Sequence, residues 1–386
     1  MRLALLKGNR FNPWHLTAFA QMDGVDVTAF RAESEIQQYF QERGADKLPF
    51  PVEPIYFDYQ AGPWLKRKVN QFTMNRLHRS PRILPFHERL KDFDCILSWE
   101  LFTDWSAEAV KAKERYGIPL AIMVWDNIPF NNEDTPERKA IKQRVRDAAD
   151  VFIVHSDVSR DMLLEEGVDD ARIQKVWPGV DVERFSAGDG VREKYCLAKD
   201  DFVLLFVGWL LPRKGIDYLL EAMRLLLNDD DIPTDKLQLL IVGSGPGRDR
   251  VNAIVDVLAL QNHCTFAGSV PYEAMPAVYN SADCFVLPSI DTPTWKEQFG
   301  MSLIEAMACG LPCVGTQSGA IPEIAGPGAM LCPPEDGEAL AAALKPLLHD
   351  AAHCVKAGLH NRHVAEERYA LKDHGAAMST LLLSLS

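Results

Sequence analysis

Two glutamates eight residues apart, Glu297 and Glu305, are the most informative pair of potentially reactive side chains in this chain of 386 residues. Glu297 lies in a predicted loop, and Glu305 lies in the first turns of a predicted helix over 301–309 that Gly310 and Pro312 would end. A carboxylate accepts hydrogen bonds with two oxygens, so the pair is suited to the paired hydroxyls of a sugar. The alternative for Glu305 alone is a first-turn acid that interacts with the helix dipole.

Turns or loops with glycine follow three predicted strands, 202–207, 237–242 and 284–287, and each precedes a helix. Because the carboxyl ends of parallel strands form a common ligand-binding edge, we expect these turns to meet there. Glycine lets the backbone approach a phosphate closely, and the N–H groups that begin the helix are donors. Arg213 and Lys214 would add two positive charges. The combination predicts a phosphate or diphosphate site.

Short apolar stretches alternate with helical patterns along most of the chain, which predicts parallel sheets covered by helices. The strands predicted for the first half are 3–7, 25–30, 55–57, 95–99, 120–125 and 151–155. A second series follows the Pro-Gly pair at 178–179, so we predict an α/β fold with two doubly wound, Rossmann-like domains. The expected domains are 1–178 and 179–365, with a final helical stretch over 361–383 and a segment 366–386 that packs back across the junction.

Composition excludes several classes of protein. The net charge is −13, which argues against a nucleic-acid-binding protein. No apolar run is long enough for a transmembrane helix, and the N-terminus lacks the pattern of a signal peptide. The eight cysteines include no C-x-x-C pair and no zinc-finger spacing, so we expect free thiols, no metal site and a cytoplasmic protein.

One basic segment stands out against the acidic total. From Lys66 to Lys91 there are eight Lys or Arg residues and one acid, Glu88, and apolar side chains from Trp64 onward are interleaved with them. One interpretation of 64–91 is peripheral contact with an anionic membrane surface or an anionic acceptor. The other is a solvated helix face, or a face that docks onto the acidic remainder of the chain.

The segment from Glu297 to Pro312, E-Q-F-G-M-S-L-I-E-A-M-A-C-G-L-P, resembles the E-x7-E signature of the retaining glycosyltransferases of family 4. These enzymes have the GT-B fold, in which two Rossmann-like domains face a central cleft. The stretches 178–181, 206–208 and 241–246 resemble the domain junction and the donor-site turns of the same family. The N-terminal half shows little recognisable similarity.

The resemblance implies a hexosyltransferase-type enzyme that moves a sugar from a nucleotide-diphosphate sugar to an acceptor hydroxyl, with retained configuration and without metal or cofactor. It places Glu297 at the donor sugar, Glu305 at the ribose hydroxyls and Lys214 at the diphosphate, with Arg213 beside it. The other donor-binding residues that it implies are Gly243, Val270, Phe299, Gly300, Met301, Ser302 and Leu303. A UDP-sugar is the favoured donor, and GDP- or ADP-sugars stay open.

Two positions depart from the family pattern. Trp209 stands where the family usually has Arg, so one diphosphate cation is missing unless Arg213 replaces it. Trp125-Asp126 stands where many members have His-Asp at the end of a first-domain strand. Trp125 would either stack on a sugar ring or belong to the core, and Asp126 stays available as a catalytic carboxylate.

The N-terminal half is the side expected to bind a glycan, lipid-linked or small-molecule acceptor. Gly8, Asn9 and Arg10 follow the first strand, and Glu100 follows the strand 95–99, so all are candidates for the cleft. The alternative for Glu100 is an exposed loop acid.

Two other functions stay open at this point: a sugar-nucleotide hydrolase or epimerase, and a non-catalytic scaffold subunit of a glycan pathway.

Overall fold

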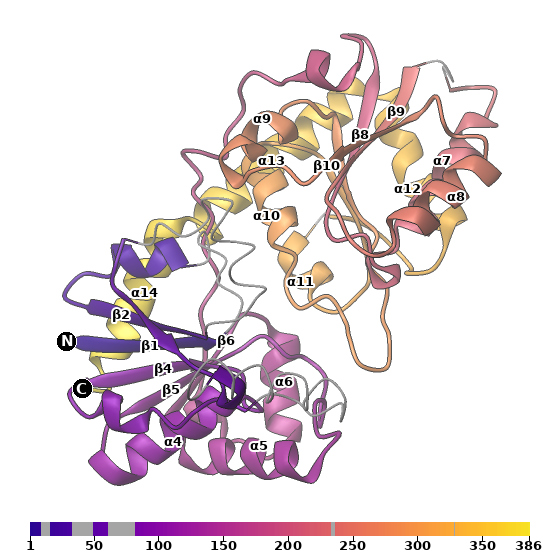
Figure 1. Cartoon of the computed structure of the whole chain (residues 1–386). Helices are drawn as coiled ribbons and strands as arrows, with labels where there is room; N and C mark the ends of the chain where they lie inside the picture. The colour runs from indigo at the N-terminus through magenta and orange to yellow at the C-terminus, as the bar shows by residue number, and fades with distance from the viewer. Residues whose placement is uncertain (9–15, 33–48, 61–81, 233–235, 328) are drawn as a thin grey trace. The chain divides into compact units, whose positions relative to one another are not determined.

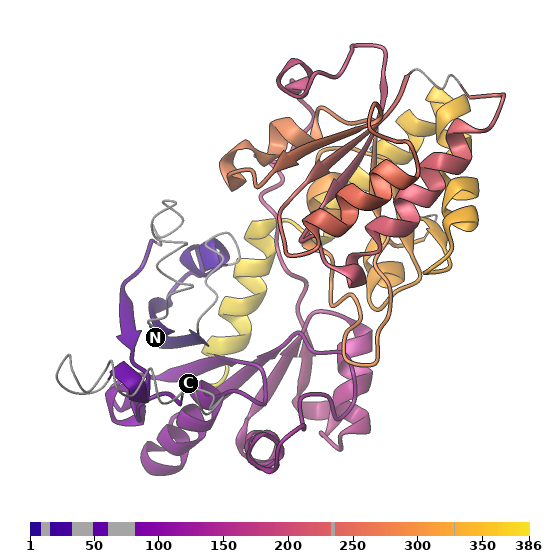
Figure 2. The same cartoon turned by 45° about the vertical axis from the view of Figure 1, so that its right-hand side comes forward.

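The chain divides into two compact units, each built on one parallel sheet. The computed structural model describes residues 1–386 except 9–15, 33–48, 61–81, 233–235 and 328. The N-terminal unit comprises 1–155, 159–179 and 372–386, and the C-terminal unit comprises 156–158 and 180–371. Helices lie beside both sheets in the two views of Figures 1 and 2. The predicted α/β class with two Rossmann-like parallel sheets is thereby confirmed.

The N-terminal sheet has the strand order β3-β2-β1-β4-β5-β6-β7, and neighbouring strands are parallel. Its strands are β1 (Arg2–Gly8), β2 (Asp26–Ala32), β3 (Val52–Ile55), β4 (Cys95–Trp99), β5 (Leu120–Val124), β6 (Val151–Val154) and β7 (Ile173–Lys175). Every residue of β4 and β5 is buried, which explains their largely apolar sequence, with Ser98 of β4 as the polar exception. The order reverses between β1 and β4, so the ends of these strands flank a switch point.

Both faces of this sheet are covered. Leu3 and Leu5 belong to one hydrophobic cluster, whereas Ala4 and Leu6 belong to another, as the alternation of side chains along a strand requires. Helices α4 (Asp104–Tyr116), α5 (Pro136–Ala148), α6 (Asp157–Glu165) and α14 (Leu371–Leu383) accompany the sheet. The last of these, drawn in yellow beside β1 in Figure 1, contributes Met378 to the first cluster.

The predicted helical stretch over 361–383 consists of the end of one helix and the whole of a second, which meet within it. Helix α13 (Ala351–Arg368) ends before Tyr369, whose φ of −120° is not helical, and α14 begins at Leu371. The Val180 N–H donates to the carbonyl of Tyr369 at 2.7 Å, and the Leu371 N–H donates to the carbonyl of Val180 at 2.9 Å. The carbonyl of Tyr369 and the N–H of Leu371 therefore bond to Val180, a distant residue, instead of to groups within a helix.

The C-terminal sheet has the order β10-β9-β8-β11-β12-β13 and is parallel throughout. Its strands are β8 (Phe202–Val207), β9 (Leu237–Val242), β10 (Cys264–Gly268), β11 (Cys284–Leu287), β12 (Cys313–Thr316) and β13 (Met330–Cys332). Its helices, besides α13, are α7 (Ile216–Leu227), α8 (Arg248–Val257), α9 (Met275–Tyr279), α10 (Met301–Ala308), α11 (Ile321–Ala325) and α12 (Gly337–His349). The strand order reverses between β8 and β11, which places a ligand crevice at their carboxyl ends.

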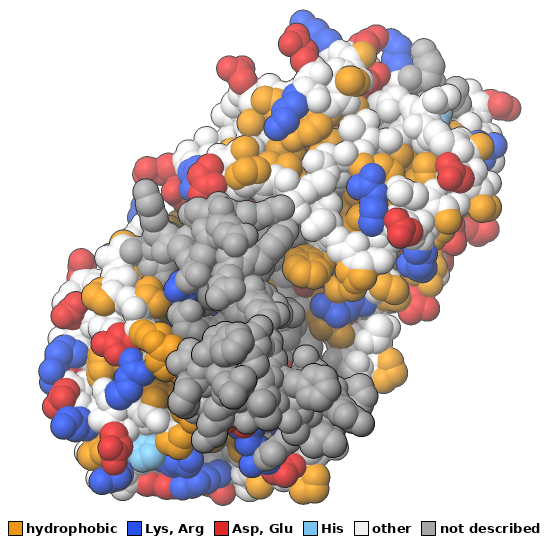
Figure 3. All heavy atoms as spheres, in the orientation of Figure 1, with side chains coloured by type: hydrophobic (Ala, Val, Ile, Leu, Met, Phe, Trp, Pro, Cys, Tyr) orange, Lys and Arg blue, Asp and Glu red, His pale blue; other side chains and the backbone are white. Residues whose placement is uncertain are grey.

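Of the basic segment 64–91, residues 64–81 lie outside the described residues. In the described remainder, Arg89 forms an ion pair with Glu53. A guanidinium nitrogen of Arg82 lies 3.5 Å from a carboxylate oxygen of Glu137, and one of Arg115 lies 3.0 Å from a carboxylate oxygen of Glu88. Figure 3 shows blue and red side chains interspersed on this unit. For 82–91 these contacts favour docking within the unit over a free basic face.

Two features that the composition predicted are visible in the structure. All eight cysteines carry free thiols, and most of them are buried. No helix in the described parts of the chain is both long enough and apolar enough to cross a membrane.

Candidate active site

Lys214 and Glu297 meet at the carboxyl ends of β8 and β11. Lys214 ends a short 3-10 turn after β8, and Glu297 lies in the loop between β11 and α10. Lys214 Nζ lies 2.7 Å from Glu297 Oε2, and the Ser289 hydroxyl donates to the same oxygen at 2.6 Å. The Glu297 side chain is 7% exposed, and such a carboxylate requires a compensating charge. The fold has thus joined two residues that the sequence analysis selected 83 positions apart.

The position of Glu297 is also held through its backbone. The Ala320 N–H donates to the Glu297 carbonyl at 2.9 Å, and the Glu297 N–H donates to Ser318 Oγ at 3.4 Å. Ser318 in turn donates to Asp291 at 2.6 Å. These contacts tie the loop to the segment after β12, so the carboxylate is oriented before any ligand arrives.

Glu305 lies inside α10 and is buried. The Tyr279 hydroxyl donates to Glu305 Oε2 at 2.7 Å. Burial raises the pKa of Glu305 to about 7, although the tyrosine hydroxyls of Tyr279 and Tyr272 act in the opposite direction. A buried carboxyl that accepts a tyrosine hydroxyl differs from the first-turn acid interacting with the helix dipole that was the alternative interpretation.

The first turn of α10 provides fewer free donors than predicted. The Leu303 N–H donates to the carbonyl of Gly300 at 2.8 Å, so the expectation of a free donor at Leu303 is wrong. Met301 and Ser302 occupy the helix positions whose N–H groups have no partner within a helix. The Phe299 ring is buried, with its centroid 5.9 Å from that of Tyr369, so Phe299 can contribute only backbone atoms.

The turns after β8 and β9 touch each other. Val207 pairs with Val242 at the ends of these strands, and the Gly208 N–H donates to the Val242 carbonyl at 3.0 Å. A Cβ atom at Gly243 would lie 1.9 Å from the carbonyl oxygen of Gly208. Gly243 is therefore required for this close approach. Val270 follows β10, the next strand, and is half-buried.

Two tryptophans lie in the segments that follow β8 and β11. Trp209 is 57% exposed. The Trp295 ring centroid lies 4.8 Å from Arg213 Cζ and 4.7 Å from Lys214 Nζ. The sequence analysis selected Trp209 and both cations but missed Trp295, together with Ser289 and Tyr279. Of these three residues, only Ser289 could have been predicted from the sequence, because it follows a predicted strand closely.

In the N-terminal unit, Glu100 ends β4 at the switch point. Its φ of +63° is unusual for a residue other than glycine. Oε1 accepts the Trp125 N–H at 3.1 Å, whereas buried Oε2 has no partner among the described residues. Burial, and to a smaller extent the charge of Asp126, raises the pKa of Glu100 to about 8. The alternative of an exposed loop acid is therefore wrong.

Asp126 and Trp125 follow β5. The carboxylate of Asp126 is buried and accepts the N–H groups of Asn127 at 2.9 Å and Ile128 at 3.3 Å, and the side-chain amides of Asn131 at 3.0 Å and Asn132 at 2.9 Å. This geometry favours a loop-positioning role over the predicted catalytic role. The Trp125 ring packs on the core, and its centroid lies 4.3 Å from that of His155, which favours its core interpretation.

The first strand carries the remaining predicted acceptor residues. Gly8 is the last residue of β1, and Asn9 and Arg10 lie outside the described residues. Lys7, next to Gly8, places Nζ 5.1 Å from the centroid of the Trp99 ring, and burial lowers the pKa of Lys7 to about 7.

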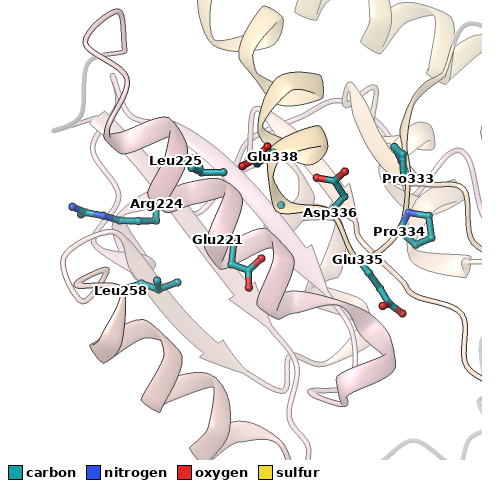
Figure 4. A pocket seen from close by; sticks show the side chains of 10 residues that line it. Glu221, Arg224, Leu225, Leu258, Pro333, Pro334, Glu335, Asp336 and Glu338 are labelled. Carbon is teal, nitrogen blue, oxygen red and sulfur yellow. The ribbon is translucent and has the colours of Figure 1, made fainter.

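A shallow pocket elsewhere in the C-terminal unit does not include the predicted site. Glu221, Arg224 and Leu225 of α7 line it together with the segment 333–338, and in Figure 4 the Arg224 side chain points away from that segment. Carboxylates of Glu335 and Glu338 add to its negative lining, which would repel a diphosphate. No cluster of metal-ligating side chains is found in the described part of the chain.

Two family models match the chain. The model of Glycosyltransferase Family 4 matches residues 14–184, and that of Glycosyl transferases group 1 matches residues 190–363. The N-terminal half therefore does carry recognisable similarity, contrary to expectation, because a family model weighs many weakly constrained positions that no short motif represents.

Curated relatives match the chain in part. It is 34% identical to the D-inositol 3-phosphate glycosyltransferase of Mycobacteroides abscessus over 227 residues, which are 55% of this chain and 48% of the relative. It is 29% identical to the GDP-mannose-dependent alpha-(1-6)-phosphatidylinositol monomannoside mannosyltransferase of Mycolicibacterium smegmatis, over 64% of this chain and 65% of that protein. The chain thus spans about half the length of the first of these relatives.

Solved structures share the fold over the whole chain. HepE of Anabaena, determined in complex with UDP, superimposes with a TM-score of 0.77 at 18% identity and 100% coverage of both chains. Sucrose-phosphate synthase of Thermosynechococcus elongatus gives 0.75 at 21% identity, covering 100% of this chain and 99% of the other. With two family models that together match most of its length, the chain belongs to the family 4 glycosyltransferases of GT-B fold.

Proposed function

We propose that this protein transfers a sugar from a nucleotide-diphosphate sugar to an acceptor hydroxyl, with retention of the anomeric configuration. The contact between Lys214 and Glu297 at the switch point carries this proposal. It places a cation and a sugar-binding carboxylate side by side at the edge where α/β sheets bind ligands. The complexes of HepE with UDP and with UDP-glucose support a uridine nucleotide, whereas the name of the mannosyltransferase supports GDP-mannose.

The donor would be held in three parts. Buried Glu305 accepts the ribose hydroxyls, and Val270 lies near the base. The N–H groups of Met301 and Ser302 at the start of α10 bind phosphate, aided by the positive end of the helix dipole. Glu297 binds hydroxyls of the donor sugar near the reacting carbon.

The chemical step separates a sugar from a nucleoside diphosphate, so negative charge grows on the leaving group. Lys214 and Arg213 would neutralise that charge, which is the work that a metal ion does in other transferases. Preorganised charges of this kind act strongly because they need no reorganisation during the reaction. The proposed reaction is therefore metal-independent.

The acceptor would bind to the N-terminal unit, near the switch point where Glu100 follows β4. The names of the curated relatives point to acceptors with an inositol ring. Peripheral contact with a membrane through 64–91 stays a prediction, because most of that segment is not described.

The test is a thermal-shift panel of UDP, GDP and ADP and their common sugars on the wild-type protein and on Glu305→Gln. A ligand at 100 times its Kd stabilises the folded state by about 2.7 kcal/mol. We expect one nucleotide to stabilise the wild type and to lose most of that effect in Glu305→Gln. Glu338→Ala, an exposed acid of α12, is the matched control and should behave as the wild type.

If no nucleotide stabilises the wild type, the proposed donor site is wrong. If a nucleotide binds but its sugar is only hydrolysed, the hydrolase alternative is favoured, and if it binds without any turnover, the scaffold alternative is favoured. The configuration of a transferred sugar is read from the anomeric proton coupling in NMR.

A further inference from the structure

We propose that Trp295 is a positioning residue that holds Arg213 and Lys214 side by side, so that the pair forms the binding site for the β-phosphate of the nucleotide. This inference rests on the proposed function. The observation behind it is that both cationic groups lie within 5 Å of one indole ring, at 4.8 Å and 4.7 Å from its centroid. A cation over an aromatic face is attracted by the negative potential of that face.

The loop that carries Trp295 is built to fix the ring. The Thr292 N–H and hydroxyl both donate to the Trp295 carbonyl, at 2.8 Å and 3.1 Å, and the Trp295 N–H donates back to the Thr292 carbonyl at 3.3 Å. Asp291, just before this turn, accepts the hydroxyl of Ser318 at 2.6 Å. The ring therefore sits on a closed turn that is anchored to the segment after β12.

The turn that carries the cations is joined to the same loop. The Ile290 N–H donates to the Arg213 carbonyl at 3.0 Å. Gly215 follows Lys214 with a φ of +66°, and a Cβ atom there would lie 1.8 Å from the carbonyl oxygen of Pro288. Only glycine permits this approach, so the two segments that carry the cations and the ring are locked together.

The repulsion between Arg213 and Lys214 explains why a group that holds them together is needed. Adjacent cations repel each other, and Glu297 offsets the charge of Lys214 through their 2.7 Å contact. The indole offsets part of the remaining repulsion without adding negative charge that would repel a phosphate. Trp209, in the same segment after β8, is an exposed indole that cannot supply charge. The pair held by Trp295 supplies the two cations, with the guanidinium fork suited to phosphate oxygens.

The test compares the affinities of UMP and UDP, or of GMP and GDP if guanine is the base, by calorimetry. The Kd of the monophosphate divided by the Kd of the diphosphate measures what the β-phosphate adds to binding. We expect Trp295→Leu to reduce this ratio by about five- to thirtyfold, which corresponds to the loss of two cation–π contacts. The affinity for the monophosphate should be unchanged. Trp295→Phe keeps an aromatic face and should restore part of the ratio. The dependence of UDP affinity on salt should also weaken in Trp295→Leu.

The result that overturns the inference is a ratio in Trp295→Leu equal to that of the wild type. An equal loss of monophosphate and diphosphate affinity would overturn it as well, because the ring would then contact the nucleoside or support the fold. If the wild type binds no nucleotide, the proposed function itself fails. Arg213→Ala combined with Trp295→Leu completes a double-mutant cycle, in which additive effects would exclude the coupling.

Discussion

Each unit of this protein contains a lysine–glutamate contact, and the two differ in what surrounds them. In the N-terminal unit, Lys142 pairs with Glu166, and the two side chains are 1% and 0% exposed. In the C-terminal unit, Lys214 pairs with Glu297, and these side chains are 19% and 7% exposed. The first pair is sealed by protein, whereas the second borders the proposed donor site.

The sealed pair holds a loop. Lys142 also donates to the carbonyl of Asn131 at 3.0 Å, and Glu166 accepts the Phe130 N–H at 2.7 Å. Phe130 and Asn132 both have positive φ values, so this network stabilises a strained loop that exposes the Phe130 ring. The half-buried pair has a Ser289 hydroxyl as an additional partner, and a phosphate oxygen could replace Glu297 at Lys214. The same two residue types thus serve structure where water is excluded, and we propose that they serve chemistry in the half-buried pair, where a ligand can enter.

The largest expected effect is on catalysis. Lys214→Met should lower kcat by about 10²- to 10³-fold, as the loss of one preorganised charge-stabilising donor does in other enzymes. The assay is release of the nucleoside diphosphate from the donor identified by thermal shift. Lys296→Met, which removes a neighbouring cation that lies 3.9 Å from Asp291, is the matched control. A near-normal kcat in Lys214→Met would show that Lys214 does not neutralise the leaving group.

The next effect is on stability. Lys142→Met should reduce the free energy of unfolding by about 3 kcal/mol, the lower end for breaking a buried pair, because Arg146 still lies 2.8 Å from Glu166. Lys139→Met on the same helix removes an exposed cation and should cost under about 0.5 kcal/mol. Urea unfolding measures both. Equal losses in the two variants would show that the sealed pair has no special structural role.

The smallest effect is a pH dependence in the C-terminal unit. Burial raises the pKa of Glu305 to about 7, and in the proposed donor site its ionised form would accept two ribose hydroxyls. Its ionised fraction rises with pH, so nucleotide affinity should increase about tenfold between pH 6 and pH 8. Calorimetry at several pH values measures the change, and Glu305→Gln should show a flat profile. A wild-type affinity that falls over this range would contradict the proposed role of the carboxylate.

Much of the fold was predictable from local patterns. The strands 95–99, 202–207 and 237–242 were predicted with their observed bounds, because largely apolar runs of this length follow directly from burial. The third strand was misplaced at 55–57 and is observed as Val52–Ile55. The edge strands Ile173–Lys175 and Met330–Cys332 were not predicted, because three-residue strands with partly exposed side chains lack a periodic signal.

The candidate site was predictable only in its charged members. Glu297, Glu305 and Lys214 could be selected because charged residues next to glycine turns and strand ends are conspicuous in a sequence. Tyr279 and Trp295 could not, because their roles arise from contacts with segments that are distant along the chain. Asp126 was predicted to be catalytic because it stands where many family members have the acid of a His-Asp pair, yet its oxygens accept hydrogen bonds from the loop that follows it.

The sequence by itself determined the class of fold, the parallel sheets and the identity of the charged residues at the strand ends, since each depends on hydrophobic periodicity or on side-chain chemistry. The tertiary structure decided which charges meet, which are sealed from water and which helix breaks, as at Tyr369 where Val180 takes its carbonyl. Those outcomes depend on distances between residues far apart in the chain, and electrostatic energies change steeply with distance and burial.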